Sequence, residues 1–283
     1  MAKKKSILDF FTMKREGRKI TFLTAYTYPT AQFAEAAGLD LLLVGDSLGM
    51  CVYGYPSTVP VTMEQMIYHS EAVRRGAPNT FIVGDMPFMS YQSSIEKAVE
   101  NAGRFLKEAQ CDCVKVEGGV RAAPAIRAIA DAGIAIMGHI GLTPQSSSQL
   151  GGHKAQGLTA EAARLVIEDA LAVQDAGAQM ILLEAIPPEV GAVITERLEI
   201  PVFSIGAGVH CDGQLVIVSD LIGEFVAFTP RFVKKYADVA GVVTDAMKAY
   251  CTEVRDGTFP GDEHCYKMRK GEKEKLAAII DTP

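Results

Sequence analysis

The sequence lacks the features that mark membrane, secreted or nucleic-acid-binding proteins. No apolar run approaches the roughly 18 residues that a membrane-spanning helix needs, and no apolar stretch follows the N-terminal lysines as in a signal peptide. Lysine and arginine number 28 against 34 acidic residues, and the resulting net charge of −6 argues against a nucleic-acid surface. We therefore expect a cytoplasmic protein that binds neither membranes nor nucleic acid, with the lysines at residues 3–5 forming a solvated N-terminus.

Cysteine patterns that would indicate a disulfide framework or a zinc site are also missing. The six cysteines are scattered, with no C-x-x-C pair and no Cys/His spacing typical of zinc. Free cysteines are often buried, and the alternation of Cys111 and Cys113 in an apolar run places both in or near the core. We interpret all six as structural thiols: Cys51, Cys111, Cys113, Cys211, Cys251 and Cys265.

What the sequence does contain is a regular alternation of short apolar runs and longer amphipathic stretches. The short runs predict strands at residues 20–25, 41–44, 80–84, 113–117, 134–138, 179–184 and 201–205. The amphipathic stretches predict helices at residues 28–37, 62–75, 93–109, 122–132, 159–176 and 188–197. Because the short runs are almost continuously apolar, they are typical of a parallel sheet that is covered on both faces.

Seven β/α repeats are readable, and an eighth strand is expected near residues 225–228. Eight repeats in 283 residues favour an α/β fold with a single closed (β/α)₈ TIM barrel over an open doubly wound sheet. No linker divides the chain, so we predict one barrel domain over residues 1–266 and a charged extension at 267–283. The long connections at 45–61 and 139–158 are expected to carry function, as long structured loops usually do.

Four acidic residues, Asp46, Asp85, Glu117 and Glu184, each follow or end one of the apolar runs. If the runs are parallel strands, their C-terminal ends converge on one mouth of the barrel, where carboxylates repel each other unless a cation or a proton relieves the charge. The pattern therefore predicts an active site with a divalent metal. Structural alternatives exist, because Asp46 and Asp85 could cap helices and Glu184 could be a helix N-terminal acid instead of a general base.

Lys115 and Glu117 are two residues apart in one predicted strand, so they point to the same face. If that face is the barrel interior, burying both is costly unless they pair or meet a ligand. An internal Lys–Glu salt bridge is the structural alternative. His139 closes another predicted strand, and we interpret it as lining the site rather than as a catalytic residue.

Several long motifs occur in the order in which one enzyme family has them. They are VGDSLGM at residues 44–50, PVTMEQMIYH at 60–69, AVRRGAPN at 72–79, KVEGG at 115–119, GHIGLTPQS at 138–146, IGAG and DGQ within 205–214, and PGDEH at 260–264. Over about residues 6–266 the chain resembles ketopantoate hydroxymethyltransferase (3-methyl-2-oxobutanoate hydroxymethyltransferase). The resemblance implies a (β/α)₈ barrel of the phosphoenolpyruvate mutase type.

The resemblance also implies a metal-dependent one-carbon transferase. Its reaction moves a hydroxymethyl group from 5,10-methylenetetrahydrofolate to 3-methyl-2-oxobutanoate through a Mg²⁺-stabilised enolate. The product is 2-dehydropantoate, in the first committed step of pantothenate and coenzyme A biosynthesis. Family members are homodecamers, so the resemblance implies that assembly too.

By position, the resemblance assigns roles to the strand-end residues. Asp46, Asp85 and Glu117 match the ligands of one Mg²⁺ per subunit, and Glu184 matches the proton acceptor. The residues that match contacts of the 2-oxo acid are Asp46, Ser47, Asp85 and Lys115.

Other functions remain open from the sequence. A metal-dependent carbon–carbon lyase of the same superfamily would use the same metal chemistry, but the K-x-C-G-H type loop that carries a reactive cysteine in such relatives is not found here. A Schiff-base aldolase that uses Lys115 is disfavoured, because a neighbouring carboxylate and a metal would keep the amine protonated. A barrel that serves as a scaffold or metabolite sensor would belong to a non-enzymatic class.

Overall fold

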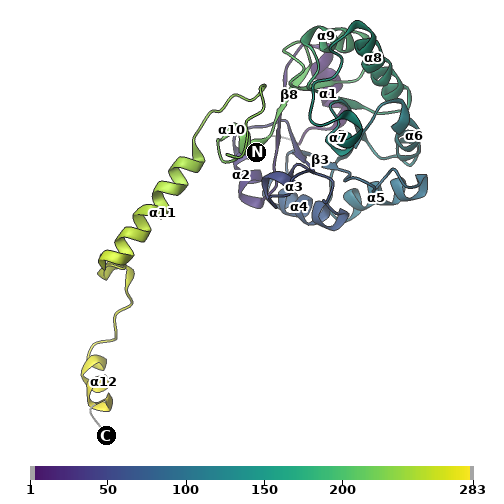
Figure 1. Cartoon of the computed structure of the whole chain (residues 1–283). Coiled ribbons are helices and arrows are strands. Elements are labelled where there is room, and N and C mark those ends of the chain that lie inside the picture. The colour runs from purple at the N-terminus through teal and green to yellow at the C-terminus, as the bar shows by residue number, and fades with distance from the viewer. Residues whose placement is uncertain (1–3, 281–283) are drawn as a thin grey trace. The chain divides into compact units, whose positions relative to one another are not determined.

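Eight short parallel strands close into one barrel in the computed structural model, which describes residues 4–280 (Figure 1). Each strand pairs with the next in the sequence, and the eighth pairs with the first to close the ring. The strands are β1 (Ile20–Thr24), β2 (Leu41–Val44), β3 (Phe81–Asp85), β4 (Cys113–Glu117), β5 (Ile136–Gly141), β6 (Met180–Glu184), β7 (Val202–Ile205) and β8 (Gly213–Val216). The predicted (β/α)₈ TIM barrel is therefore confirmed.

Seven strands lie where their apolar runs predicted them, within three residues at each end. The predicted eighth strand is wrong, because residues 225–228 form no strand and β8 lies upstream. β8 starts with a glycine, exposes Gln214 and takes in only the first two residues of the short apolar run LVIV at 215–218, which was not predicted as a strand. Phe225 and Phe228 instead pack edge to face, with ring centroids 5.3 Å apart, and line a cavity.

Helices connect the strands and cover the outer face of the barrel (Figure 1). Outward-facing Val114 and Val116 of β4 pack in one buried cluster with Ala98 and Phe105 from the helix that precedes this strand. The α-helices up to residue 221 are α1 (Ile7–Arg15), α2 (Tyr28–Ala36), α3 (Leu48–Cys51), α4 (Met63–Gly76), α5 (Ile95–Lys107), α6 (Ala123–Asp131), α7 (Ser147–Leu150), α8 (Ala160–Asp175), α9 (Pro188–Arg197) and α10 (Val218–Leu221). Short 3₁₀ helices span Val120–Ala122 and Pro144–Ser146.

The inward-facing side chains change from apolar to charged along the strands. Phe81 and Val83 of β3 belong to a second buried cluster inside the barrel, and Asp85 follows them on the same face. In β4 the corresponding positions near the C-terminal end are Lys115 and Glu117. The interior is thus a packed core at the N-terminal end of the strands and a polar chamber at the C-terminal end, where active sites of this fold lie.

Helix α1 closes the N-terminal end of the barrel. Its Phe10 is fully buried and packs edge to face on Phe81, with ring centroids 5.1 Å apart. The interpretation of Lys4 and Lys5 as simply solvated is wrong, because both reach aspartates that precede strands; Lys3 lies outside the described residues. The ion pairs of this segment are Lys4–Asp112 at 2.6 Å, Lys5–Asp40 at 2.9 Å and Lys14–Asp212 at 2.8 Å.

Replacing Phe10 by alanine will lower the free energy of unfolding by about 3 kcal/mol, because a buried ring is lost and a cavity remains. Urea unfolding followed by circular dichroism measures this change. Leu8→Ala is the matched control, since Leu8 lies on the same helix with 70% of its surface exposed, and its loss should cost less than about 0.5 kcal/mol. Equal costs for the two variants would contradict the packing of α1 described above.

The chain divides into two compact units, Met1–Tyr236 and Ala237–Pro283. The first unit holds the barrel, and the second contains α11 (Val239–Asp256), a 3₁₀ turn at Asp262–His264 and α12 (Glu272–Ile280). The boundary expected after residue 266 therefore falls inside the second unit, because no change of composition marks the end of the barrel unit at Tyr236.

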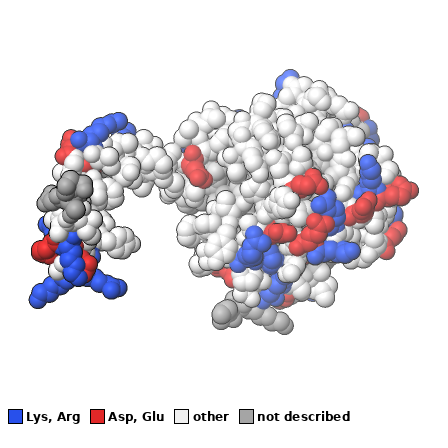
Figure 2. All heavy atoms as spheres, turned by 90° about the horizontal axis from the view of Figure 1, so that it is seen from below, with Lys and Arg blue, Asp and Glu red and all other residues white. Residues whose placement is uncertain are grey.

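The helices, the surface charges and the cysteines can be compared with the sequence-based expectations about membranes, nucleic acid and buried thiols. None of the helices between residues 4 and 280 is both long and apolar enough to span a membrane. On the face of the barrel seen in Figure 2, basic and acidic side chains are intermingled rather than gathered into a patch of one sign. Cys111 and Cys113 are buried, as expected, whereas Cys251 and Cys265 are exposed thiols.

Candidate active site

One cavity of about 990 Å³ at the C-terminal ends of the strands collects the predicted site residues. Asp85, Glu117 and Glu184 are the last residues of β3, β4 and β6, and Asp46 lies two residues beyond β2. The structure thus brings the four strand-end acids together. The predicted residues in the cavity wall are Asp46, Ser47, Asp85, Lys115, Glu117, His139 and Glu184.

Lys115 is the cation among these carboxylates. Its Nζ lies 2.8 Å from Asp85 Oδ1 and 3.5 Å from Glu117 Oε1, and the side chain is almost fully buried. Burial lowers the pKa of Lys115, but the adjacent carboxylates of Asp85, Glu117 and Asp46 outweigh it and raise that pKa above its ordinary value. The amine therefore stays charged, which is unfavourable for a Schiff base.

His139 connects two of the acids. Its Nδ1 lies 3.1 Å from Glu117 Oε1, and its Nε2 lies 3.1 Å from Glu184 Oε2, although this second contact lacks the alignment of a hydrogen bond. Burial and Lys115 lower the pKa of His139, but the two carboxylates raise it to about 9. Lys115 Nζ also lies 3.2 Å from His139 Nδ1. Because β5 continues to Gly141, His139 lies inside the strand rather than at the start of a loop.

Asp46, Asp85 and Glu117 each have one carboxylate oxygen held by a backbone or amide N–H group of the site. The backbone N–H of Asp46 donates to Asp85 Oδ2 at 2.9 Å. Gln145 donates twice, from Nε2 to Asp46 Oδ2 at 3.0 Å and from its backbone N–H to Glu117 Oε2 at 3.1 Å. These bonds fix the orientation of the carboxyl groups.

The charges in the cluster do not balance. Burial, followed by the Asp85 and Glu117 carboxylates, raises the pKa of Asp46 well above its ordinary value. Burial also raises the pKa of Asp85 despite the opposing effect of Lys115. Burial alone would raise the pKa of Glu117 too, but Lys115 and His139 bring it below its ordinary value. A further cation would relieve the remaining repulsion.

Ser47 extends the polar wall towards β1. Its Oγ lies 2.8 Å from the hydroxyl oxygen of Tyr26, which is buried at the end of that strand. The two hydroxyls form a short hydrogen-bonded pair beside Asp46.

Comparison with known proteins assigns the chain to a family. The family model described as ketopantoate hydroxymethyltransferase matches residues 4–262. A protein named 3-methyl-2-oxobutanoate hydroxymethyltransferase from Alkaliphilus metalliredigens is 61% identical over 274 residues, 97% of each chain. One of the same name from Heliobacterium modesticaldum is 50% identical over 268 residues, 95% of this chain and 97% of the relative. The chain belongs to the ketopantoate hydroxymethyltransferase family.

Solved structures with little sequence identity share the fold of this chain. 2,3-Dimethylmalate lyase, of the phosphoenolpyruvate mutase/isocitrate lyase superfamily, has a TM-score of 0.60 at 16% identity. The match covers 100% of this chain and 100% of that one. Phosphonopyruvate hydrolase has a TM-score of 0.61 at 12% identity, covering 98% of this chain and 99% of that one. These likenesses agree with the predicted (β/α)₈ barrel fold. The names of the sequence relatives indicate a transferase.

The donor chemistry of this ketopantoate hydroxymethyltransferase family member fits Mg²⁺. Asp85 Oδ1 is buried without a hydrogen-bond partner, although Lys115 Nζ lies nearby. Asp46, Asp85 and Glu117 supply the hard carboxylate oxygens that Mg²⁺ prefers. No three His, Cys, Asp or Glu side chains within residues 4–280 already surround a metal position, and Lys115 approaches both Asp85 and Glu117 instead. Binding an ion between these two requires that ammonium to shift.

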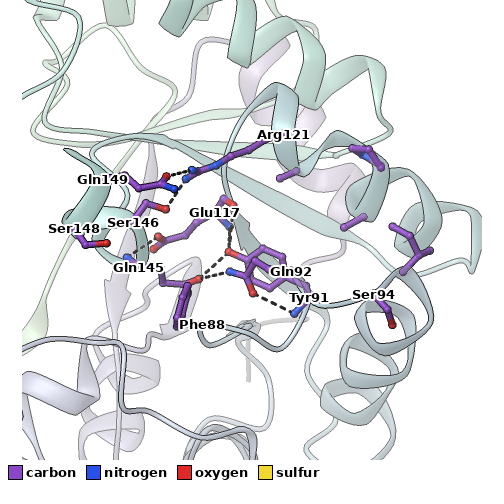
Figure 3. Close-up of a pocket in the computed structure, with 14 residues that line it drawn as sticks. Phe88, Tyr91, Gln92, Ser94, Glu117, Arg121, Gln145, Ser146, Ser148 and Gln149 are labelled. Carbon is purple, nitrogen blue, oxygen red and sulfur yellow. Dashed lines mark hydrogen bonds between the residues drawn. The ribbon is translucent and has the colours of Figure 1, made fainter. Parts of the chain in front are cut away.

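Gln145 is a site residue that the sequence analysis missed. Its side chain is buried, and while Nε2 holds Asp46, its Oε1 accepts hydrogen bonds from the Tyr91 hydroxyl at 2.8 Å and from Gln92 Nε2 at 3.2 Å. Figure 3 shows the contacts with Tyr91 and Gln92 in the wall of a second cavity of about 470 Å³, which Glu117 also lines. The one sequence signal that pointed to Gln145 is its place in the long connection at 139–158, which was expected to carry function.

Proposed function

We propose that the chain transfers a hydroxymethyl group from 5,10-methylenetetrahydrofolate to 3-methyl-2-oxobutanoate and produces 2-dehydropantoate, the first committed step of pantothenate and coenzyme A biosynthesis. The observation that carries the proposal is the placement of Glu184 in the same cavity wall as the buried Lys115–carboxylate cluster. Together these groups supply a base and a site for an anionic 2-oxo acid. The names of the close relatives support this choice of substrates.

The 2-oxo acid would be held by Asp46, Ser47, Asp85 and Lys115. Asp46, Asp85 and Glu117 would hold Mg²⁺, which supplies Lewis-acid stabilisation to the enolate when it is bound. Lys115 would add positive charge beside the carboxylate and the developing enolate oxygen of the substrate. Because the cluster is buried, this charge acts with little screening by solvent.

The proton at C3 of the substrate would be taken by Glu184. Its side chain has 15% of its surface exposed, against 2% for those of Asp85 and Glu117, so it is the most accessible of these carboxylates. His139 contacts one oxygen of Glu184 and would orient the carboxyl group. After water has released the one-carbon unit as formaldehyde, C3 forms the new bond to its carbon, and Glu184 returns the proton to the new alkoxide oxygen.

Deuterium exchange at C3 of 3-methyl-2-oxobutanoate tests this proposal without the folate carrier. We expect exchange in D₂O with Mg²⁺ and a loss of at least about 100-fold after chelation, because the enolate loses its Lewis acid. NMR of the substrate measures the rate. Equal rates with and without Mg²⁺, or a stable lysine adduct after treatment with borohydride, would contradict the metal–enolate chemistry.

We also propose a cytoplasmic homodecamer, as the family resemblance implies. The second unit supports an assembly, since α11 exposes large apolar side chains, including Val242 and Met247. The reduced thiols are consistent with the cytoplasm. Light scattering of the purified chain measures the subunit number, and a monomeric mass would contradict the decamer.

A further inference from the structure

Asp220 is a buried carboxylate in the active-site cavity that the chemistry above does not use. It lies in the short helix after β8, has 3% of its surface exposed and lines the 990 Å³ cavity. No described side chain donates a hydrogen bond to its carboxylate or lies within ion-pair distance of it. Burial raises the pKa of Asp220, although Lys235 partly opposes the shift. The Asp220 oxygens are therefore available to accept hydrogen bonds from a molecule in the cavity.

A second unpartnered polar group lines the same cavity. Thr58, from the connection at 45–61, is buried, and its Oγ1 has no hydrogen-bond partner. Apolar side chains of Met50, Ile217 and Phe225 also line this cavity, so a flat apolar ring system would find packing partners there. The volume is far larger than a five-carbon 2-oxo acid needs, which leaves space for a second molecule.

We propose that Asp220 binds the one-carbon carrier by accepting hydrogen bonds from the two adjacent N–H donors of its pterin ring, N3–H and the 2-amino group. A carboxylate has two acceptor oxygens that match this pair of donors, and such charge-assisted bonds are strong and directional. The Thr58 hydroxyl provides a second polar contact for the ring edge. This assignment rests on the proposed function, because it takes tetrahydrofolate as the carrier.

The Asp220→Asn variant tests the assignment, since it replaces one acceptor oxygen by a donor at nearly unchanged size. We expect the dissociation constant for tetrahydrofolate, measured by calorimetry, to rise by on the order of 10- to 100-fold. C3 exchange of 3-methyl-2-oxobutanoate needs no carrier and should stay within about twofold, which also shows that the variant is folded. Glu224→Gln is the control, because Glu224 lies four residues away and is exposed; both of its readouts should be unchanged.

A carrier analogue makes the test independent of the variant's folding. Tetrahydrofolate with a methyl group in place of the 2-amino group should bind the wild-type chain on the order of 10-fold more weakly, and Asp220→Asn should not discriminate between the two carriers. Equal affinity of the wild type for both carriers, unchanged carrier affinity in Asp220→Asn, or a matching loss of C3 exchange in that variant would each overturn the assignment.

A wild-type chain that exchanges C3 but does not bind tetrahydrofolate would overturn both the assignment and the choice of carrier. A chain that binds tetrahydrofolate through Asp220 but shows no exchange would contradict only the enolate chemistry.

Discussion

Replacing Glu184 by glutamine will reduce C3 deuterium exchange of 3-methyl-2-oxobutanoate by about 10³-fold, because the neutral amide cannot accept the proton. The affinity for the 2-oxo acid should change by less than about threefold, since the proposed substrate contacts lie on Asp46, Ser47, Asp85 and Lys115 and the new side chain has nearly the same shape. NMR measures the exchange, and calorimetry measures the binding. A large loss of exchange with binding retained is the pattern of a group that acts mainly in the transition state.

The control for this result is Glu189→Gln. Glu189 lies five residues further along, in the first turn of α9, and is exposed. Its replacement removes the same charge from the same region and should leave exchange unchanged. Exchange that survives in Glu184→Gln would remove Glu184 from the role of base and direct attention to the remaining carboxylates of the cavity.

Replacing Asp85 by alanine will weaken Mg²⁺-dependent binding of the 2-oxo acid by at least about 100-fold, because it would remove a carboxylate oxygen that we propose as a metal ligand. Thermal unfolding gives a readout that needs no turnover. In the wild type, Mg²⁺ with the 2-oxo acid at 100 times the dissociation constant should stabilise the fold by about 2.7 kcal/mol, and the variant should show almost none of this gain.

Asp40→Ala is the matched control for Asp85→Ala. Asp40 directly precedes β2 at the opposite end of the barrel, where it accepts hydrogen bonds from Thr21 and pairs with Lys5. Its loss should lower the stability of the unliganded protein while leaving the gain from Mg²⁺ and the 2-oxo acid in place. Full metal-dependent stabilisation of Asp85→Ala would show that Asp85 is not a ligand.

The sequence predicted the barrel because its strands are buried on both faces and therefore read as apolar runs. The acids that end β3, β4 and β6 stood out because a carboxylate directly after such a run is unusual. β8 is not a continuous apolar run that ends in an acid, since it begins with Gly213 and exposes Gln214. Helix α1 was missed because most of its residues are at least partly exposed, and only Phe10 and Met13 are buried.

Two residues of the site could not be predicted from local patterns. Gln145 acts through contacts with Asp46 and Glu117, which lie 99 and 28 residues away in the chain. A glutamine in a loop is otherwise ordinary, so its importance appears only when the strands are arranged side by side. Asp220 lies within an apolar stretch as an acid of a short helix. Only the three-dimensional structure shows that its carboxylate has no hydrogen-bond or ion-pair partner among residues 4–280.

Helix α1 has a consequence for the order of events during turnover. Because Phe10 and Met13 are buried in the core at the N-terminal end of the barrel, small molecules can reach the charged chamber only from the other end. Asp85 and Lys115 lie inside the barrel on β3 and β4, so a 2-oxo acid bound to them as proposed would sit beneath a carrier that occupies the opening. Entry and exit would then be sequential: the small acid would enter first, and its hydroxymethylated product would leave only after the spent carrier had gone.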